Sequence, residues 1–276
     1  MKPPKPISRP DRVSLLQYGR LFKKDILSAQ PARLYRAWMA EFRTPFFRSF
    51  LINQPELVKA VLRERPGDFP KSGRISEGLR PLLGESVFLT NGVQWERQRR
   101  IIDPAFEGGR LRDSFPAMLA AAKAAVSRLA AQGSGEVEIE AVASHAAADV
   151  IFRTLFSIPI EDEAANRVFS LFRDFQRSQP ILNLAAFVPL PRWMPRFFSR
   201  RTKDGAREIR TLIRALTERR LAEIEAETAP DDLATKIMTT VDPVTGETFD
   251  ADEMVDQVAI FFLAGHETSA SALAWA

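Results

Sequence analysis

The stretch FFLAGHETSASALAWA, residues 261–276, decides the fold of this chain. It continues a helical pattern that begins at Asp250, which we expect to act as the N-cap, with Glu253 at the third helical position completing a capping box. Residues 258–263 are apolar all round, and so is most of 270–275. Because a helix that is apolar on every side is typical of one with several packed neighbours, we predict a long, largely buried helix.

A polar cluster, His-Glu-Thr-Ser at 266–269, interrupts this apolar helix. A buried carboxylate such as Glu267 is costly unless it is paired, so its presence favours a functional site. Just ahead of it, Ala264 and Gly265 remove side-chain bulk and would let a flat ligand lie against the backbone. Thr268 can donate a hydrogen bond to the carbonyl of Ala264, or leave it and open a polar notch for water. The residues alone also allow a second interpretation, a helix that crosses a water-filled seam with Glu267 paired to an arginine.

The last residues of the sequence carry no helix-stop signal. No Gly, Asn or Pro follows the apolar pattern, and the last turn holds no basic residue. A helix this apolar needs neighbours on several sides. We therefore expect that the chain stops inside the helix and forms the front part of a larger, mostly helical enzyme.

The composition excludes several classes of site. The chain has no cysteine, which excludes disulfides, zinc–thiolate sites and cysteine nucleophiles within it. Its only histidines, His145 and His266, argue against a histidine-built metal site, and we assign no metal ligand. No run approaches the 18 or so apolar residues of a transmembrane helix. The Pro-rich, basic N-terminus does not resemble a secretory signal, so we expect a cytoplasmic protein without a transmembrane segment.

The charge is uneven along the chain. The formal net charge of +4 is too small to indicate a nucleic-acid-binding protein. Residues 1–24 hold seven Lys or Arg against one Asp, and we predict that they form a basic flexible arm. Residues 192–220 hold ten basic residues against three acids. Such runs usually mark solvated surfaces, and docking on an acidic partner or an anionic membrane is the alternative.

Hydrophobic periodicity predicts a fold that is mainly α with a small β component. A strand is expected at 46–52 and a short one at 137–139. Residues 66–91 read as a long loop with one helical turn near 79–83, and the proline-rich segment 180–198 is densely apolar. The helices are expected at 31–42, 55–65, 93–102, 113–132, 142–156, 162–177, 202–227, 231–240 and 250–276.

The helix at 93–102 carries a second candidate site. Trp95 and Arg99 are four residues apart and share one helix face. An indole N–H and a guanidinium on the same face make a two-donor site for a carboxylate or a phosphate. The alternative is a tryptophan that anchors a basic surface helix, with Arg97 and Arg100 in solvent.

Together the two helices resemble those of the cytochrome P-450 family of haem-thiolate monooxygenases. Residues 261–276 look like that family's long central helix, with its Ala/Gly-Gly-x-Asp/Glu-Thr-Ser/Thr signature. NGVQWERQRRIIDPAF, residues 91–106, looks like its Trp-x-x-x-Arg helix and the Pro-Ala-Phe that follows. The resemblance implies that residues 25–276 form an incomplete domain of this family, its N-terminal portion, truncated within the central helix.

The resemblance also implies roles for single residues. Trp95 and Arg99 would hold a haem propionate, and Ala264 and Gly265 would lie beside the haem face. Glu267 and Thr268 would be catalytic, the threonine hydroxyl bonding to dioxygen and the acid relaying the protons that cleave the O–O bond. The parent enzyme would use O2 and two electrons, supplied by a ferredoxin or a flavoprotein reductase, to hydroxylate an apolar organic substrate. Residues 74–90 and 180–198 would form the substrate lid, and a core-packing role for part of 180–198 is the alternative.

The departure from the family pattern is large. The family's iron is held by a cysteine thiolate, and this chain has no cysteine. The Glu-x-x-Arg helix and the haem-binding loop are absent as well. We therefore expect the chain alone to be inactive and to give no thiolate-type ferrous–CO spectrum. Two alternatives stay open: a non-enzymatic helical protein that docks on an acidic partner or a membrane surface, and a degenerate gene product.

Overall fold

The computed structural model describes residues 7–24, 27–43, 48–178 and 200–276. These fall into two compact units, one up to residue 70 and one made of residues 71–178 and the chain from 198 onward. The described residues are mainly helical with one two-stranded sheet, so the predicted fold class is confirmed. None of the described helices is long and apolar enough to cross a membrane. The segment 180–198, predicted to act as a lid, lies outside the described residues.

The first unit contains the sheet. The antiparallel strands β1 (Met39–Arg43) and β2 (Arg48–Ile52) pair with Met39 opposite Ile52, which confirms the strand predicted at 46–52. The helix predicted over 31–42 is wrong, because only a 3-10 turn, η1 (Ala32–Tyr35), forms before β1. The unit's other elements are α1 (Leu15–Lys24), α2 (Pro55–Lys59), the π-helix η2 (Ala60–Glu64) and the 3-10 turn η3 (Pro66–Asp68).

Helix α1 lies within the predicted basic arm, so part of that arm is helical. The flexibility of the arm stays a prediction.

The second unit is built from helices. Six of them match the predicted segments to within a few residues, namely α4 (Gly92–Ile102), α5 (Arg110–Ala131), α6 (Ile139–Phe156), α7 (Glu163–Ser178), α9 (Arg200–Glu225) and α10 (Leu233–Thr239). The 3-10 turn η4 (Asp103–Ala105) follows α4. The strand predicted at 137–139 is wrong, since Ile139 is the first residue of α6 and no strand forms there in the described structure.

Helix α3 (Gly73–Leu83) occupies 11 residues of the segment 66–91 predicted as a loop, and it extends well beyond the single helical turn expected near 79–83. Two glycines and Pro81 weaken its helical signal in the sequence. The helix forms nonetheless because Leu82 and Leu83 are completely buried in the core of the unit. It ends at Gly84, whose φ of +52° lies in the region that favours glycine.

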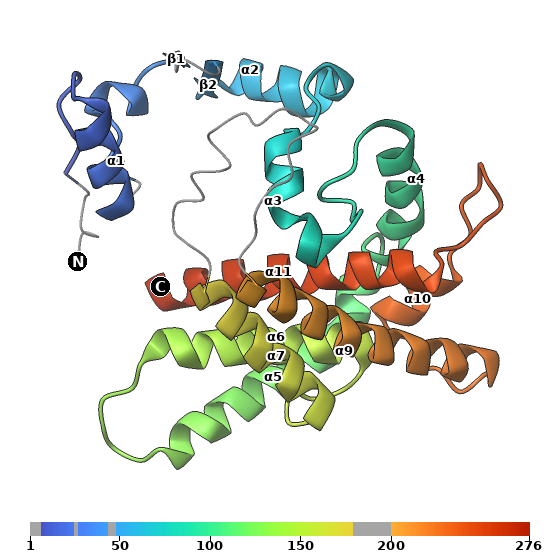
Figure 1. The fold of residues 1–276 in the computed structure, drawn as a ribbon. Helices are drawn as coiled ribbons and strands as arrows, with labels where there is room; N and C mark the ends of the chain where they lie inside the picture. Colours follow the sequence, from blue (N-terminus) through green and yellow to red (C-terminus); the bar gives the residue numbers. More distant parts are fainter. Residues whose placement is uncertain (1–6, 25–26, 44–47, 179–199) are drawn as a thin grey trace. The chain divides into compact units, whose positions relative to one another are not determined.

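Helix α11 (Ala251–Trp275) organises the core of the second unit. It begins with the predicted capping box: the Asp250 carboxylate accepts from the backbone N–H of Glu253, and the Glu253 side chain accepts from that of Asp250. Helices α3 and α4 lie on one side of α11, with α5, α6 and α7 on the other (Figure 1).

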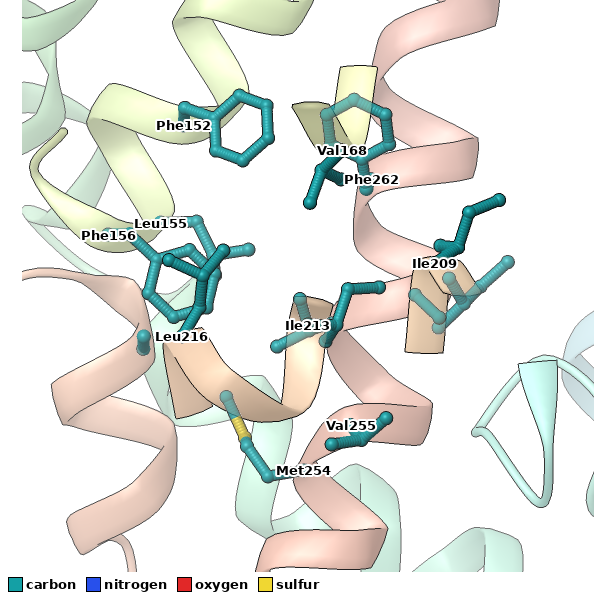
Figure 2. Close-up of a cluster of buried hydrophobic side chains, with 14 of the residues drawn as sticks. Phe152, Leu155, Phe156, Val168, Ile209, Ile213, Leu216, Met254, Val255 and Phe262 are labelled. Atoms are coloured by element: carbon teal, nitrogen blue, oxygen red, sulfur yellow. The ribbon is translucent and has the colours of Figure 1, made fainter. Parts of the chain in front are cut away.

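Side chains from α6, α7, α9 and α11 meet in one apolar cluster (Figure 2). Phe262 of α11 lies between Phe152 of α6 and Phe172 of α7, with ring centroids 5.0 Å and 4.5 Å away. Each large side chain buried here stabilises the fold by about 1.5–3 kcal/mol. Residues 254–260 of α11 are buried, but from 264 onward much of the helix is exposed. The predicted burial on several sides therefore holds only for the first half of this helix.

Candidate functional site

Ala264 and Thr268 lie one above the other on an exposed face of α11. The Thr268 hydroxyl donates to the carbonyl oxygen of Ala264 at 2.6 Å, the first of the two arrangements considered from the sequence. The opposite face of the helix is formed by Phe262, His266 and Ala270, which are buried. One side of α11 is therefore packed into the core, while the other presents a small residue and a hydroxyl.

Gly265 has a packing role that the sequence did not reveal. A Cβ at this position would lie 2.4 Å from Cδ1 of Ile151 on α6, closer than two carbon atoms tolerate. Ala143 and Ala147 of α6 also pack against Ala270 of α11. Small residues thus let the two helices approach closely. Contact between Gly265 and a flat ligand stays a prediction.

Glu267 is exposed, so the expectation of a buried carboxylate is wrong for this chain. Its Oε2 accepts a hydrogen bond from Nε2 of Gln176 on α7 at 2.9 Å, rather than from the arginine considered from the sequence. The carboxylate lines a cavity of about 380 Å³ between α6, α7 and α11, which the side chains of Glu140, Ser144 and Arg173 also line. Thr268 hydrogen-bonds to its own helix and Glu267 hydrogen-bonds to α7, so the two side chains have different partners.

His266, the first residue of the polar cluster, is a core residue and is only 2% exposed. Its Nε2 lies 2.8 Å from the Ser144 hydroxyl. The imidazole stacks on Phe262 and meets the edge of Phe169, with centroid distances of 5.6 Å and 5.5 Å. Burial, assisted by the charge of Arg173, lowers the pKa of His266 to about 4. The ring is therefore neutral at neutral pH and acts in packing.

The Trp95 helix brings its two predicted donors together. The Arg99 guanidinium lies 5.8 Å from the centroid of the Trp95 ring, as expected for residues on one face of α4. Arg99 Nε is 2.7 Å from Oδ1 of Asp103, one turn further on. Half of the Arg99 side chain remains exposed, so the guanidinium has surface left to bind an anion.

Arg97 and Arg100, which the alternative interpretation placed in solvent, form structural ion pairs. Arg97 Nη1 is 2.6 Å from Oε1 of Glu253 at the start of α11. Arg100 Nε is 2.6 Å from Oδ1 of Asp242, whose side chain is completely buried. The hydrogen bond from Arg100 holds the pKa of Asp242 well below its usual range. Both arginines thus fix α4 to the region where α11 begins.

Sequence reasoning missed Lys71, which also lies over the Trp95 ring. Its Nζ is 5.3 Å from the ring centroid and donates to the carbonyls of Val87 at 2.6 Å and Thr90 at 2.9 Å. Burial, and then the nearby charge of Arg99, lower the pKa of Lys71 to about 8. No local pattern could have identified it, because Lys71 is 24 residues from Trp95 in the sequence.

The loop between α3 and α4 is bound to α11. The backbone N–H of Glu85 donates to Oδ2 of Asp256 at 2.6 Å, and that of Val87 to Oε1 of Gln257 at 2.9 Å. Asp256 also pairs with Arg210 of α9, 2.6 Å away. A Cβ at Gly84 would lie 2.0 Å from Oδ1 of Asp256, so this turn requires glycine.

Solved structures that share this fold include cytochrome P450 structures. The P450DA haem domain aligns with a TM-score of 0.66 at 20% identity, covering 96% of this chain and 58% of that one. The structure of CYP102L1 aligns with a TM-score of 0.65 at 22% identity, covering 87% of this chain and 55% of that one. The fold is therefore that of part of a cytochrome P450 haem domain.

The cytochrome P450 family model matches residues 3–276, so the chain belongs to the cytochrome P450 family. It is 27% identical to Cytochrome P450 72A15 of Arabidopsis thaliana over 255 residues, which is 88% of this chain and 47% of that protein. A cytokinin hydroxylase of the same plant is 28% identical, over 87% of this chain and 49% of that protein. Cytochrome P450 monooxygenase FUM15 of Gibberella moniliformis is 26% identical, over 91% of this chain and 44% of that protein.

The chain spans about half the length of the curated relatives that it matches. The family resemblance predicted from residues 91–106 and 261–276 is confirmed.

The family uses haem, and the residues present fit two sides of such a group. The donors of Trp95, Arg99 and Lys71 suit a carboxylate. The exposed strip of Ala264 and Thr268 suits a flat ring. The thiolate that holds iron in the family has no counterpart, because none of the 276 residues is a cysteine. The residues present therefore fit the carboxylates and one face of a haem.

Proposed function

We propose that these residues form the oxygen-binding side of a cytochrome P450 monooxygenase site. The parent reaction is hydroxylation of an apolar organic compound with O2 and two electrons from a ferredoxin or a flavoprotein reductase. The observation that carries the proposal is the asymmetry of α11: its core face is packed with aromatic rings, and its opposite face presents Ala264 and the Thr268 hydroxyl.

Haem, when bound, supplies the redox centre at which O2 is reduced. Thr268 holds a hydroxyl proton at the edge of the exposed strip, in a hydrogen bond to the Ala264 carbonyl. Rotation about its Cα–Cβ bond would release that proton toward a ligand and leave the carbonyl free to bind water. Ala264 contributes by having no side chain beyond Cβ, so a flat ring can approach the helix.

Glu267 is suited to proton supply. Its carboxylate lines a polar cavity with Gln176 and Arg173 and is open to water. An exposed carboxylate exchanges protons quickly with solvent, and a carboxylate near a reacting site can act as a general acid. We propose that Glu267 passes protons from this cavity toward the face where Thr268 lies.

Trp95 and Arg99 position the ring system. A carboxylate bound by the guanidinium and the indole N–H would fix one edge of the haem against α4. An apolar substrate is supported by the apolar content of 180–198 in the sequence.

The test is haem titration of the purified 276-residue chain, followed by absorption in the haem region. We expect binding that Ala264→Phe weakens at least tenfold, because the added ring occupies the exposed strip. Ser269→Phe is the matched control, since Ser269 is exposed but lies on another side of α11. We expect the reduced CO complex to lack the thiolate-type spectrum. Equal haem affinity of wild type and Ala264→Phe, or a thiolate-type spectrum, would contradict the proposal.

A further inference from the structure

The Lys71 ammonium lies beside Trp95 and has one N–H group that is not used in a hydrogen bond to the loop. An ammonium has three N–H bonds, and two of them are directed at the carbonyls of Val87 and Thr90. The backbone of the same residue is fixed as well, because its N–H donates to Oδ1 of Asn91 at 2.8 Å and its carbonyl accepts from Nδ2 of Asn91 at 3.3 Å. Lys71 is therefore fixed in place with one N–H left for a further acceptor.

The surroundings of this donor are positively charged. Arg99 lies on the same indole as Lys71, and its acidic partner is Asp103 of the next turn. Within the described residues, no Asp or Glu forms an ion pair with Lys71. Two cations that share one aromatic ring repel each other, and the pKa of Lys71 is lowered first by burial and then by this repulsion. An anion placed at the ring would neutralise the excess charge and fill the open donor.

We propose that Lys71 is a third donor to the carboxylate bound at Trp95 and Arg99, and that it couples this carboxylate to the loop between α3 and α4. The inference rests on the proposed function, which supplies the carboxylate. A carboxylate has about four acceptor positions and can accept from an indole, a guanidinium and an ammonium together. Because Val87 and Thr90 share the same ammonium, a bound carboxylate also fixes the loop that carries them.

A lysine that merely ties loop carbonyls together would behave differently. Its loss would loosen the loop whichever ligand is present. A carboxylate-binding lysine discriminates between haem and haem dimethyl ester, in which both carboxylates are blocked. The informative quantity is therefore the ratio of the two affinities, because an unfolding effect changes both alike and cancels from the ratio.

The experiment measures binding of haem and of its dimethyl ester to wild type, Lys71→Met and Lys71→Arg, with hydrogen exchange of residues 84–91. Lys59→Met is the control, since Lys59 is an exposed lysine in the other unit. We expect wild type to prefer haem, Lys71→Met to lose about tenfold of that preference, and Lys71→Arg to keep most of it. In wild type, haem should slow hydrogen exchange of the loop and the ester should not. In Lys71→Met, neither ligand should slow it.

Two results would overturn the inference in distinguishable ways. If Lys71→Met keeps the wild-type preference while Arg99→Ala loses it, the carboxylate site is present and Lys71 has no part in it. If wild type binds haem and the ester equally well and Arg99→Ala changes nothing, the carboxylate site itself is absent, and the proposed function fails along with the role of Lys71.

Discussion

His266, Glu267 and Thr268 are consecutive residues with three different environments. His266 packs among aromatic rings, Glu267 bonds to α7, and Thr268 bonds to the carbonyl of Ala264. Each step along an α-helix turns the side chain by about 100°, so neighbours in sequence face different neighbours in space. A polar cluster in the sequence is thus divided here into a core residue, a cavity residue and a residue on the exposed strip.

The buried His266 should make the fold sensitive to acid. Its pKa is about 4 in the folded protein and about 6.5 when unfolded. Between these values the unfolded state binds more protons than the folded state. The contribution of His266 to the free energy of unfolding therefore has its full value above about pH 6.5 and decreases as the pH falls toward 4. The loss attributable to His266 is at most about 3 kcal/mol. Urea unfolding at several pH values, with His266→Gln compared against wild type, measures it.

The lowered pKa of His145, also a consequence of burial, acts in the same direction, so His266→Gln should keep a smaller slope. A slope unchanged by the substitution would show that His266 is already protonated or solvated in the fold.

Lys71 should make carboxylate binding depend on pH. The groups that face it are Arg99, the carbonyls of Val87 and Thr90, and the indole of Trp95. Below its pKa of about 8 the amine is already protonated, so the preference for haem over its ester should be constant. Above that pH a proton must be taken up on binding, so the preference should decrease. Titration at pH 7 and pH 9 measures it, and Lys71→Arg should remove the decrease.

Arg219 and Arg220 are adjacent on α9 but differ in burial. The Arg220 side chain is 5% exposed, pairs with the equally buried Asp232 and donates to the carbonyl of Phe156 at 2.7 Å. Arg219 is 61% exposed and pairs with Glu223. Removing one partner of a buried pair leaves an uncompensated charge, so Arg220→Met should cost about 3–5 kcal/mol of unfolding free energy. Arg219→Met should cost less than about 1 kcal/mol. Denaturant unfolding measures both losses. An equal loss of unfolding free energy in the two variants would contradict the difference in burial between Arg219 and Arg220.

At the scale of elements, the contact between α6 and α11 depends on Gly265. Gly265→Ala adds a methyl group that meets Cδ1 of Ile151, and we expect a loss of about 1–3 kcal/mol in spite of alanine's better helix propensity. Ile151→Val removes that Cδ1, so the double variant should be more stable than the sum of the single effects. A double-mutant cycle in urea measures the coupling. If the losses of unfolding free energy are strictly additive, the added methyl group does not meet Cδ1 of Ile151, and α6 and α11 have moved apart to accommodate it.

Local sequence patterns predicted those elements whose stability is local. Helices from α4 onward follow an apolar period of 3.6 residues, and their predicted bounds agree with the structure to within a few residues. Two of the failures depend on distant partners. Residues 39–43 become a strand because 48–52 pair with them, and α3 forms because Leu82 and Leu83 enter a core made mostly by later helices.

The candidate site divides in the same way. Trp95 and Arg99 are four residues apart on α4, and Ala264 and Thr268 are four residues apart on α11. Pairs with this spacing share a helix face, so both could be predicted from the sequence. The partners Lys71 and Gln176 come from other segments. Only the tertiary fold brings them to the site, and so the sequence could not reveal them.

At the scale of the whole molecule, α5 presents an apolar stripe to solvent. Phe115, Leu119, Val126 and Leu129 follow helical spacing and are 58%, 40%, 67% and 36% exposed. Exposed apolar patches of this kind favour association. We expect the purified chain to self-associate as its concentration rises, and Val126→Glu to reduce this. Ser127→Glu adds the same charge to the neighbouring exposed residue and should have a smaller effect in light scattering after gel filtration.

The two hydrogen bonds from the loop after α3 to α11 also set an order of events during synthesis. Glu85 and Val87 are translated early, yet their partners Asp256 and Gln257 are 171 and 170 residues further along. Until the ribosome has made that part of α11, the two N–H groups can bond only to water. The proposed carboxylate site, whose lysine is bound to this loop, therefore cannot be completed before α11 has been made. A translation pause before residue 256 would delay it without affecting the contact between α5 and α6.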